Sequence, residues 1–229
     1  MNCIGLRIHK ETHMLLSYFQ ENGTEVGCDE AGRGCLAGPV FAAAVIFDRN
    51  YTHENLNDSK QLTVTKRQAL RKLIESEAVE YAVSWVDASE IDQINIHQAS
   101  YMAMHRAIDQ LQSRPDFLLI DGKHFIPYRE VAHQCVIKGD GKYLSIAAAS
   151  ILAKTYRDEY MEQIAAEHPQ YGWAQNKGYP TTAHRIAVLE HGPSPYHRLS
   201  FRVTDPRQMA QAAPNINIIE AMSEIVSPI

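Results

Sequence analysis

Cysteine is scarce in this chain, and long apolar runs are missing from it. Four cysteines occur among the 229 residues, and no two of them form a C-x-x-C pair, so a zinc site is not expected. No stretch reads as a signal peptide or as a transmembrane helix. Internal repeats and low-complexity blocks are missing as well. These absences favour a reduced cytoplasmic protein that has no membrane partner.

The chain also lacks an excess of positive charge. Its 22 Lys and Arg residues against 27 Asp and Glu residues give a net charge of −5 and a pI of about 6.1. This balance argues against indiscriminate binding to nucleic acid, although a site built from several acids would itself lower the total. The second half is locally basic, and its cations form either a solvated face or a grip on a phosphate backbone: Lys138, Lys142, Lys154, Arg157, Lys177, Arg185, Arg198 and Arg202.

What is present fits one domain with a buried core and a small C-terminal appendage, since 45% of the residues are hydrophobic. The spacing of apolar residues predicts helices over 9–20, 63–77, 89–112, 144–166 and 182–190, and strands over 25–28, 39–47, 78–86, 117–120 and 130–137. Strands that come first and then mix with helices indicate an α/β fold, with a central mixed sheet flanked by helices.

Two adjacent acids, Asp29 and Glu30, follow the first expected strand and precede a glycine-rich turn. Adjacent carboxylates suit hard divalent cations such as Mg²⁺. Gly32 and Gly34 leave the backbone without side chains, so that a polymer can approach it closely. Few structural roles need both features, so this segment is the first candidate for a functional site.

Asp121 follows a second apolar strand, and neighbouring strands lie about 5 Å apart. Asp29 and Asp121 could therefore share one metal ion, although Asp121 before Gly122 also suits an ordinary turn. Glu30 would point to the opposite face of a regular strand, so it joins the site only if the chain ends or bends there. Asp140, between two glycines, reads either as a turn residue or as a fourth acid.

Six motifs together resemble the type 2 ribonucleases H, and bacterial ribonuclease HII in particular. They come in that family's order: Asp29-Glu30-Ala31-Gly32-Arg33-Gly34, Asn57-Asp58-Ser59-Lys60, Leu118-Leu119-Ile120-Asp121-Gly122, Lys138-Gly139-Asp140 with the segment 143–154, Asn176-Lys177-Gly178-Tyr179-Pro180, and Gly192-Pro193-Ser194-Pro195-Tyr196-His197-Arg198. The resemblance implies a ribonuclease-H-like catalytic domain over 25–202. It leaves 1–24 as an N-terminal extension or helix and 203–229 as a C-terminal helical tail.

The resemblance also implies an activity and its residues. Such an enzyme hydrolyses the RNA strand of RNA–DNA hybrids and cuts 5′ of ribonucleotides embedded in duplex DNA, leaving a 3′-hydroxyl and a 5′-phosphate. Two divalent ions, Mn²⁺ or Mg²⁺, would serve the reaction. The implied catalytic and metal-binding residues are Asp29, Glu30, Asp121 and Asp140, and the implied substrate-binding residues are Gly32, Arg33, Gly34, Lys60 and Tyr179.

Two alternatives stay open at this point. A type 3 ribonuclease H usually carries an extra N-terminal domain, whereas about 24 residues precede the first motif here. An inactive module that binds hybrids is disfavoured because all four candidate acids are present. The tail shows no sliding-clamp-binding pattern, since no paired aromatics follow Gln208 and Gln211. We expect a monomer with roles in DNA replication and ribonucleotide excision repair.

Overall fold

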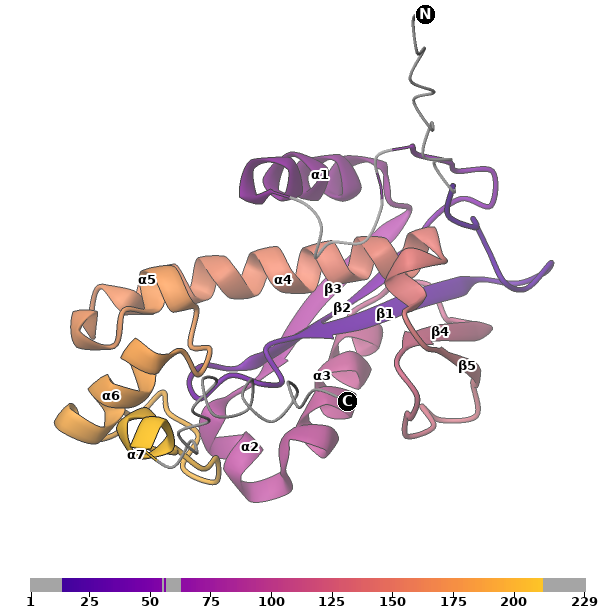
Figure 1. Ribbon diagram of the computed structural model, residues 1–229. Coiled ribbons are helices and arrows are strands. Elements are labelled where there is room, and N and C mark those ends of the chain that lie inside the picture. Colours follow the sequence, from indigo (N-terminus) through magenta and orange to yellow (C-terminus); the bar gives the residue numbers. More distant parts are fainter. Residues whose placement is uncertain (1–13, 55, 57–62, 212–229) are drawn as a thin grey trace, which may run out of the picture.

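The computed structural model describes residues 14–54, 56 and 63–211. Five strands form one sheet in the order β3-β2-β1-β4-β5 (Figure 1). β1 (Glu25–Ala31) runs antiparallel to β2 (Val40–Ile46), which runs antiparallel to β3 (Glu80–Val86). On the other side, β4 (Phe117–Asp121) and β5 (Ala132–Val136) run parallel to β1. The α/β class and the mixed sheet expected from the sequence are confirmed.

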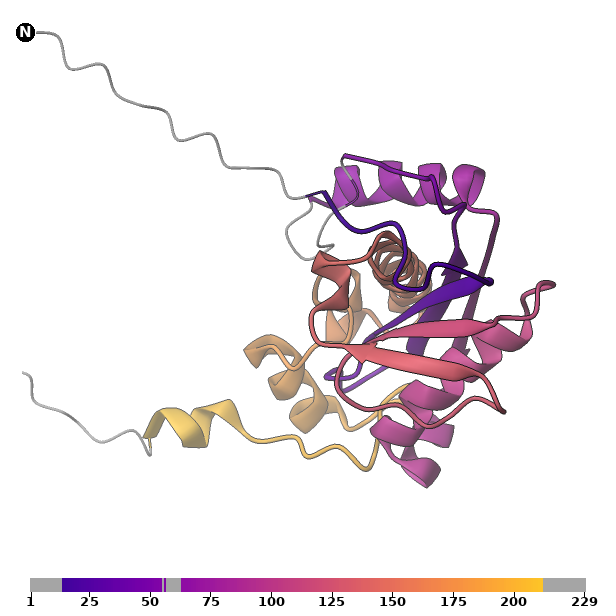
Figure 2. The same cartoon turned by 90° about the vertical axis from the view of Figure 1, so that its right-hand side faces the viewer.

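Helices cover both faces of this sheet, as the two views show (Figures 1 and 2). α4 (Leu144–Ala165) packs on β1 and β2, and α1 (Val64–Glu77) packs on α4. α3 (Ile96–Asp109) covers β2 and β3 from the opposite face. The C-terminal part adds α5 (Trp173–Asn176), α6 (Thr182–His191) and α7 (Pro206–Gln211).

Small residues let α4 lie close to the central strand. A Cβ atom on Gly27 of β1 would stand 2.4 Å from the backbone carbon of Ser145 in α4, a distance that real side chains do not tolerate. The alanines 147–149 and Ile151 of the same helix are fully buried. Close packing of this kind fixes how the residues further along α4 face the end of β1.

The single helix expected over 89–112 is wrong. Two helices occur there, α2 (Ala88–Ile94) and α3, and they are separated at Asn95, which has φ +68°. Asparagine tolerates this left-handed conformation, and its side chain accepts hydrogen bonds from the N–H groups of His97 and Gln98 at the start of α3. Apolar residues continue through both helices, so their spacing alone did not reveal the break.

The helix expected over 9–20 is also not found in its described part. Residues 14–20 lie in irregular structure, and residues 1–13 fall outside the described residues. Leu16 donates its N–H to the carbonyl of Lys142 at 2.8 Å and accepts from the N–H of Leu144 at 2.9 Å. Phe19 stacks on Phe117 with ring centroids 5.6 Å apart. This segment is therefore held against the start of α4 by backbone pairing rather than by helix formation.

Two further observations concern the helices and the cysteines. Across residues 14–54, 56 and 63–211, no helix combines the length and the apolar character needed to cross a membrane. The described cysteines Cys28, Cys35 and Cys135 are all unpaired.

Candidate active site

The first two acids occupy neighbouring positions on adjacent strands, near the end of β1 and at the end of β4. β1 and β4 are paired in parallel with Cys28 opposite Ile120, so the next residues, Asp29 and Asp121, occupy equivalent positions on the face that carries α4. Asp29 is 4% exposed. Burial raises its pKa, and the charges of Glu30 and Asp121 raise it further, while a hydrogen bond from Ser150 works against them. The two strand ends thus hold carboxylates that repel each other.

Glu30 reaches the same cavity from the opposite face of β1, so the expectation that it would need the strand to end or bend at this point is wrong. β1 continues through Ala31, and the chain turns only at Gly32, where φ is +96°. Glu30 therefore points away from Asp29, as the alternation of a regular strand requires. Burial raises the pKa of Glu30, Arg33 opposes that increase, and Asp121 adds to it. Asp121 consequently lies close enough to interact with the acids on both faces of β1.

Asp140 is buried in a turn that is hydrogen-bonded to Asp121. It is 3% exposed and lies in a short 3₁₀ turn, Gly139–Gly141, that follows β5. The N–H of Gly139 donates a hydrogen bond to Asp121 Oδ1 at 2.7 Å. The turn of Asp140 is therefore joined to Asp121, but Asp140 does not line the cavity that the other three acids share.

A cavity of about 310 Å³ opens at these strand ends. Its walls bring together three of the expected acids with the glycine-rich turn and the expected tyrosine; the lining is Asp29, Glu30, Ala31, Gly32, Arg33, Gly34, Arg67, Asp121, Ser150, Lys154 and Tyr179. Lys154 from α4 and Arg67 from α1 add positive charge beside the acids. Lys60, the remaining expected substrate residue, lies outside the described residues.

The donor set fits a hard divalent cation. Carboxylate oxygens are the ligands that Mg²⁺ and Mn²⁺ prefer, and a cation would relieve the repulsion that raises the pKa of Asp29. The side chains do not form a finished metal cage, however. Within the part of the chain that the structure describes, no three Asp, Glu, His or Cys side chains are grouped closely enough to hold an ion. Glu30 instead pairs with Arg33 at 2.9 Å.

Two buried arginines, Arg157 and Arg198, support the cavity from behind, so neither reading offered by the sequence, a solvated face or a phosphate contact, applies to them. Arg157 donates to the carbonyls of Pro39, Ala37 and Lys177 at 2.8–3.0 Å. Arg198 donates to the carbonyls of Gly38 and Arg33 at 2.8–3.0 Å. Both guanidinium groups therefore donate their hydrogen bonds to backbone carbonyls of the protein and not to a substrate phosphate. Arg157 ties the segment after the glycine-rich turn to the loop that carries Tyr179, and Arg198 ties that segment to the turn itself.

Tyr179 faces the cavity with part of its ring accessible. The residue is 39% exposed, and its ring centroid lies 5.6 Å from Lys154 Nζ and 5.9 Å from Arg157 Cζ. Gly178, next to it, accepts a backbone hydrogen bond from Leu36 at 2.8 Å. The tyrosine ring is thus presented beside the glycine-rich turn by a loop that is hydrogen-bonded to the segment following that turn.

A buried histidine pair supports the same loop from behind. Trp173 donates to His184 Nε2 at 3.0 Å, so that nitrogen carries no proton and His184 Nδ1 donates to the carbonyl of Tyr179 at 2.9 Å. His197 Nδ1 accepts from the N–H of Ser194 at 2.9 Å, and His197 Nε2 donates to His184 Nε2 at 3.1 Å. Both rings are therefore neutral, in keeping with burial, which lowers the pKa of His184 and lowers that of His197 to about 4.

Three residues at the site were not identified from the sequence as site residues. Ser150 sits in a stretch of α4 that reads as core packing, although Ser150 and Lys154 are spaced i, i+4 and so share one helix face. Arg67 lies on α1, which no motif includes. His97 reaches Arg33 because the chain breaks at Asn95. The spacing on α4 could have revealed the first; the other two depend on tertiary packing.

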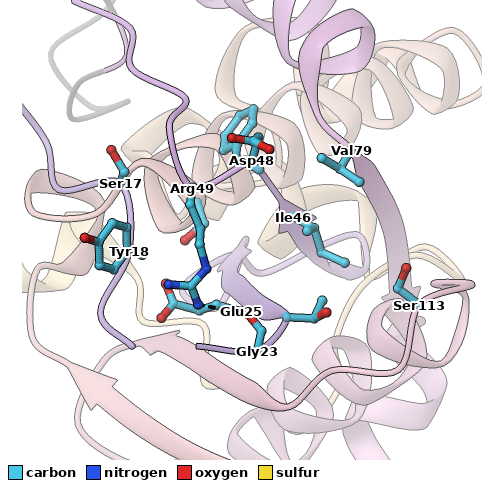
Figure 3. Close-up of a pocket in the computed structure, with 12 residues that line it drawn as sticks. Ser17, Tyr18, Gly23, Glu25, Ile46, Asp48, Arg49, Val79 and Ser113 are labelled. Carbon is cyan, nitrogen blue, oxygen red and sulfur yellow. Dashed lines mark hydrogen bonds between the residues drawn. The ribbon is translucent and has the colours of Figure 1, made fainter. Parts of the chain in front are cut away.

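A second cavity, of about 230 Å³, lies at the other end of β1 (Figure 3). Figure 3 shows Arg49 and Glu25 pointing toward each other in it. The Glu25 carboxylate accepts hydrogen bonds from the N–H groups of Phe19 and Gln20 at 2.9–3.1 Å. The half-buried Glu25 is thus occupied in holding the N-terminal segment, and the paired acids mark the opposite end of β1 as the candidate active site.

Comparison with known proteins agrees with this geometry. The family model described as Ribonuclease HII matches residues 26–204. The Ribonuclease HII of Parabacteroides distasonis is 60% identical over 196 residues, which are 86% of this chain and 98% of that protein, and that of Bacteroides thetaiotaomicron is 59% identical with the same coverage. The crystal structure of the ribonuclease H2 from Pyrococcus horikoshii OT3 aligns with a TM-score of 0.67 at 25% identity, covering 82% of this chain and 97% of that one.

The structural match shows the ribonuclease-H-like fold, and the similarity in sequence favours type 2 over type 3 ribonuclease H. The cavity residues lie within the matched region, from Asp29 to Tyr179. The chain therefore belongs to the ribonuclease HII family and is a metal-dependent hydrolase that acts on RNA–DNA hybrids.

Proposed function

We propose that this enzyme is an endonuclease that cuts the RNA strand of hybrids and also cuts 5′ of ribonucleotides embedded in duplex DNA. The products are a 3′-hydroxyl and a 5′-phosphate. The observation that carries this proposal is one cavity lined by Asp29, Glu30 and Asp121 together with the turn at 32–34 and Tyr179. Acids for phosphodiester hydrolysis and groups able to recognise a ribose are combined there.

Asp29, Glu30 and Asp121 would hold the divalent cations, with Asp140 as a fourth ligand next to Asp121. Two bound Mn²⁺ or Mg²⁺ ions would supply Lewis acidity toward the phosphate and a more acidic water molecule. The carboxylates contribute the negative charge that the ions need. Ser150 fixes the orientation of Asp29 through its hydrogen bond. Because water is the nucleophile, the 2′-hydroxyl is not consumed, and this accounts for the proposed product ends.

Selection of a ribonucleotide requires contact with its 2′-hydroxyl. Gly32, Arg33 and Gly34 offer backbone polar groups at the cavity wall, and a Cβ on Gly34 would meet no atom within 4 Å. The accessible ring of Tyr179 would stack on the sugar of the following nucleotide. The two buried arginines and the histidine pair hold these groups in fixed relation to the acids.

Phosphate groups of the substrate would meet cations at the rim of the cavity. Lys154 and Arg67 both line it, and Asp158 pairs with each of them. A shared carboxylate holds the two cations on neighbouring helices without burying either. Lys60 remains a proposed phosphate contact that lies outside the described residues.

The wider setting is proposed on the same basis. Unpaired cysteines suit a reducing compartment, and we propose a monomeric enzyme of the cytoplasm that serves DNA replication and ribonucleotide excision repair. No sliding-clamp partner is proposed, because no clamp-binding pattern follows Gln208 in the sequence.

A substrate panel tests the proposal. Three end-labelled duplexes are compared in Mg²⁺ and in Mn²⁺: all-DNA, DNA with one ribonucleotide, and a continuous RNA–DNA hybrid. We expect cleavage of the second and third and none of the first, with a single cut on the 5′ side of the lone ribonucleotide. A hybrid-binding module without catalysis would cut none of them. An enzyme that degrades the hybrid but ignores the lone ribonucleotide would contradict the proposed repair activity.

A further inference from the structure

A chain of three side chains crosses from β1 to α3 at the edge of the cavity. Arg33 Nη1 donates to Glu30 Oε1 at 2.9 Å, and Arg33 Nη2 donates to His97 Nδ1 at 2.8 Å. Arginine has donors only, so His97 Nδ1 is the acceptor and the ring carries its proton on Nε2. The guanidinium group is therefore held at both ends, by a carboxylate and by a neutral imidazole.

The position of His97 depends on the break between α2 and α3. Asn95 caps α3 by accepting from the N–H of His97 at 3.0 Å, which places the histidine in the first turn of that helix. An unbroken helix through this region would carry the ring elsewhere, because it would lack the left-handed residue at Asn95. The local backbone thus directs His97 at Arg33.

Arg33 is ion-paired with Glu30, a carboxylate that a metal ion would also bind. Its guanidinium is the main positive charge that offsets the burial of Glu30. A divalent cation and a guanidinium at the same carboxylate repel each other, so the two compete for Glu30. A cavity of about 130 Å³, lined by Glu30, Arg33, His97, Tyr101, Met104, Asp121 and their neighbours, adjoins the pair. It gives the guanidinium room to move when it leaves Glu30.

We propose that Arg33 is an internal counter-ion that competes with the divalent cation for Glu30, and that His97 is a positioning residue that keeps Arg33 in place. Loading of metal then requires Arg33 to release Glu30. A substrate phosphate offers the guanidinium an alternative partner, so metal loading and substrate binding favour each other. The inference rests on the proposed function, because it takes Asp29, Glu30 and Asp121 as the metal site.

Mn²⁺ binding in the absence of nucleic acid tests this directly, measured by titration calorimetry on the full chain. Arg33→Met keeps the length of the side chain and removes its charge, so it should bind Mn²⁺ about fivefold more tightly than wild type or better, the gain expected from breaking one partly exposed ion pair. His97→Ala should shift affinity in the same direction by a smaller factor. Both residues are near the surface, and circular dichroism would verify folding.

Arg67→Met is the matched control. Arg67 lines the same cavity but pairs with Asp158 at 3.9 Å, so its loss reports the general effect of removing a nearby positive charge. A clear gain for Arg33→Met over Arg67→Met supports the proposal. If the two variants bind Mn²⁺ equally tightly, or if Arg33→Met shows no gain while the wild type binds Mn²⁺ and cleaves, this inference is overturned and the proposed function stands. A wild-type chain that neither binds Mn²⁺ nor cleaves would overturn the proposed function and this inference together.

Discussion

Arg157 lies directly against Gly32, on the inner side of the turn that follows the acid pair. A Cβ atom on Gly32 would stand 2.0 Å from Arg157 Nε, and the residue has φ +96°. From the sequence, both glycines of this turn were expected to keep the backbone open for an approaching polymer. In the structure, a side chain at Gly32 is excluded by contact with the buried Arg157, whereas a side chain at Gly34 would project into open space.

The two glycines should therefore respond differently to substitution. Gly34→Val should leave the melting temperature nearly unchanged and reduce cleavage by about tenfold or more, because bulk is added only where substrate approaches. Gly32→Ala should lower the melting temperature by about 4 °C or more, because it displaces a buried arginine and strains the backbone. Thermal melting and initial rates on the same preparations check both. Similar losses of stability for the two variants would contradict this division.

Asp29→Asn should separate stability from activity. The amide keeps the size of the side chain and removes a buried charge that Glu30 and Asp121 repel, so the metal-free protein should melt about 2–5 °C higher. Cleavage in Mg²⁺ should be lost, because a ligand charge is gone. A variant that keeps near-normal turnover would show that Asp29 is not a metal ligand, and a lower melting temperature would show that its charge is well compensated.

Most of the fold follows from patterns that the sequence displays openly. β2, β3, β4 and the start of α4 show apolar runs or alternation that make them recognisable, and Thr181 caps α6 as a threonine at that position should. The break at Asn95 was missed because one left-handed residue does not interrupt the apolar spacing. The segment at residues 14–20 was misjudged because its backbone pairs with residues more than 100 positions away.

Only part of the candidate active site could be predicted from the sequence. Motifs identify Asp29, Glu30, Asp121 and Tyr179, which line one cavity. The roles of Arg157 and Arg198 could not be inferred, because a guanidinium buried against backbone carbonyls looks, in sequence, the same as one that faces phosphate. That Asp140 completes the metal site stays a prediction; the Gly139 N–H in its turn donates to Asp121.

Tyr179 should act through its ring rather than its hydroxyl. Tyr179→Ala should reduce cleavage at a single ribonucleotide by about tenfold or more, whereas Tyr179→Phe should stay within a fewfold of wild type, because stacking on the sugar needs only the ring. The loss should be larger at the lone ribonucleotide than in a continuous hybrid. Single-turnover rates on the two substrates provide the comparison, and an equal loss for Phe and Ala would assign the effect to the hydroxyl.

Lowering the pH should reduce the free energy of unfolding, because His197 becomes protonated more readily in the unfolded chain. Its folded-state pKa of about 4 lies below the ordinary histidine value of about 6.5. The unfolded chain therefore binds more protons between these values, so this contribution to stability is complete above about pH 6.5 and is lost as the pH falls toward 4. His197→Gln should be less stable at pH 7.5 but should lose less stability on acidification. Urea denaturation across pH 4.5–7.5 measures this, and an unchanged pH dependence would exclude His197 as the group responsible.

The most direct test of the active-site assignment is single-turnover cleavage of a DNA duplex that carries one ribonucleotide, by wild type and by Asp121→Asn, in Mn²⁺ and after chelation with EDTA. Wild type should cut on the 5′ side of the ribonucleotide, leaving a 3′-hydroxyl and a 5′-phosphate, and should stop in EDTA and resume when Mn²⁺ is returned. Asp121→Asn should be inactive while it remains folded. Cleavage that survives exhaustive chelation, or near-normal cleavage by Asp121→Asn, would contradict a metal-dependent site at the ends of β1 and β4.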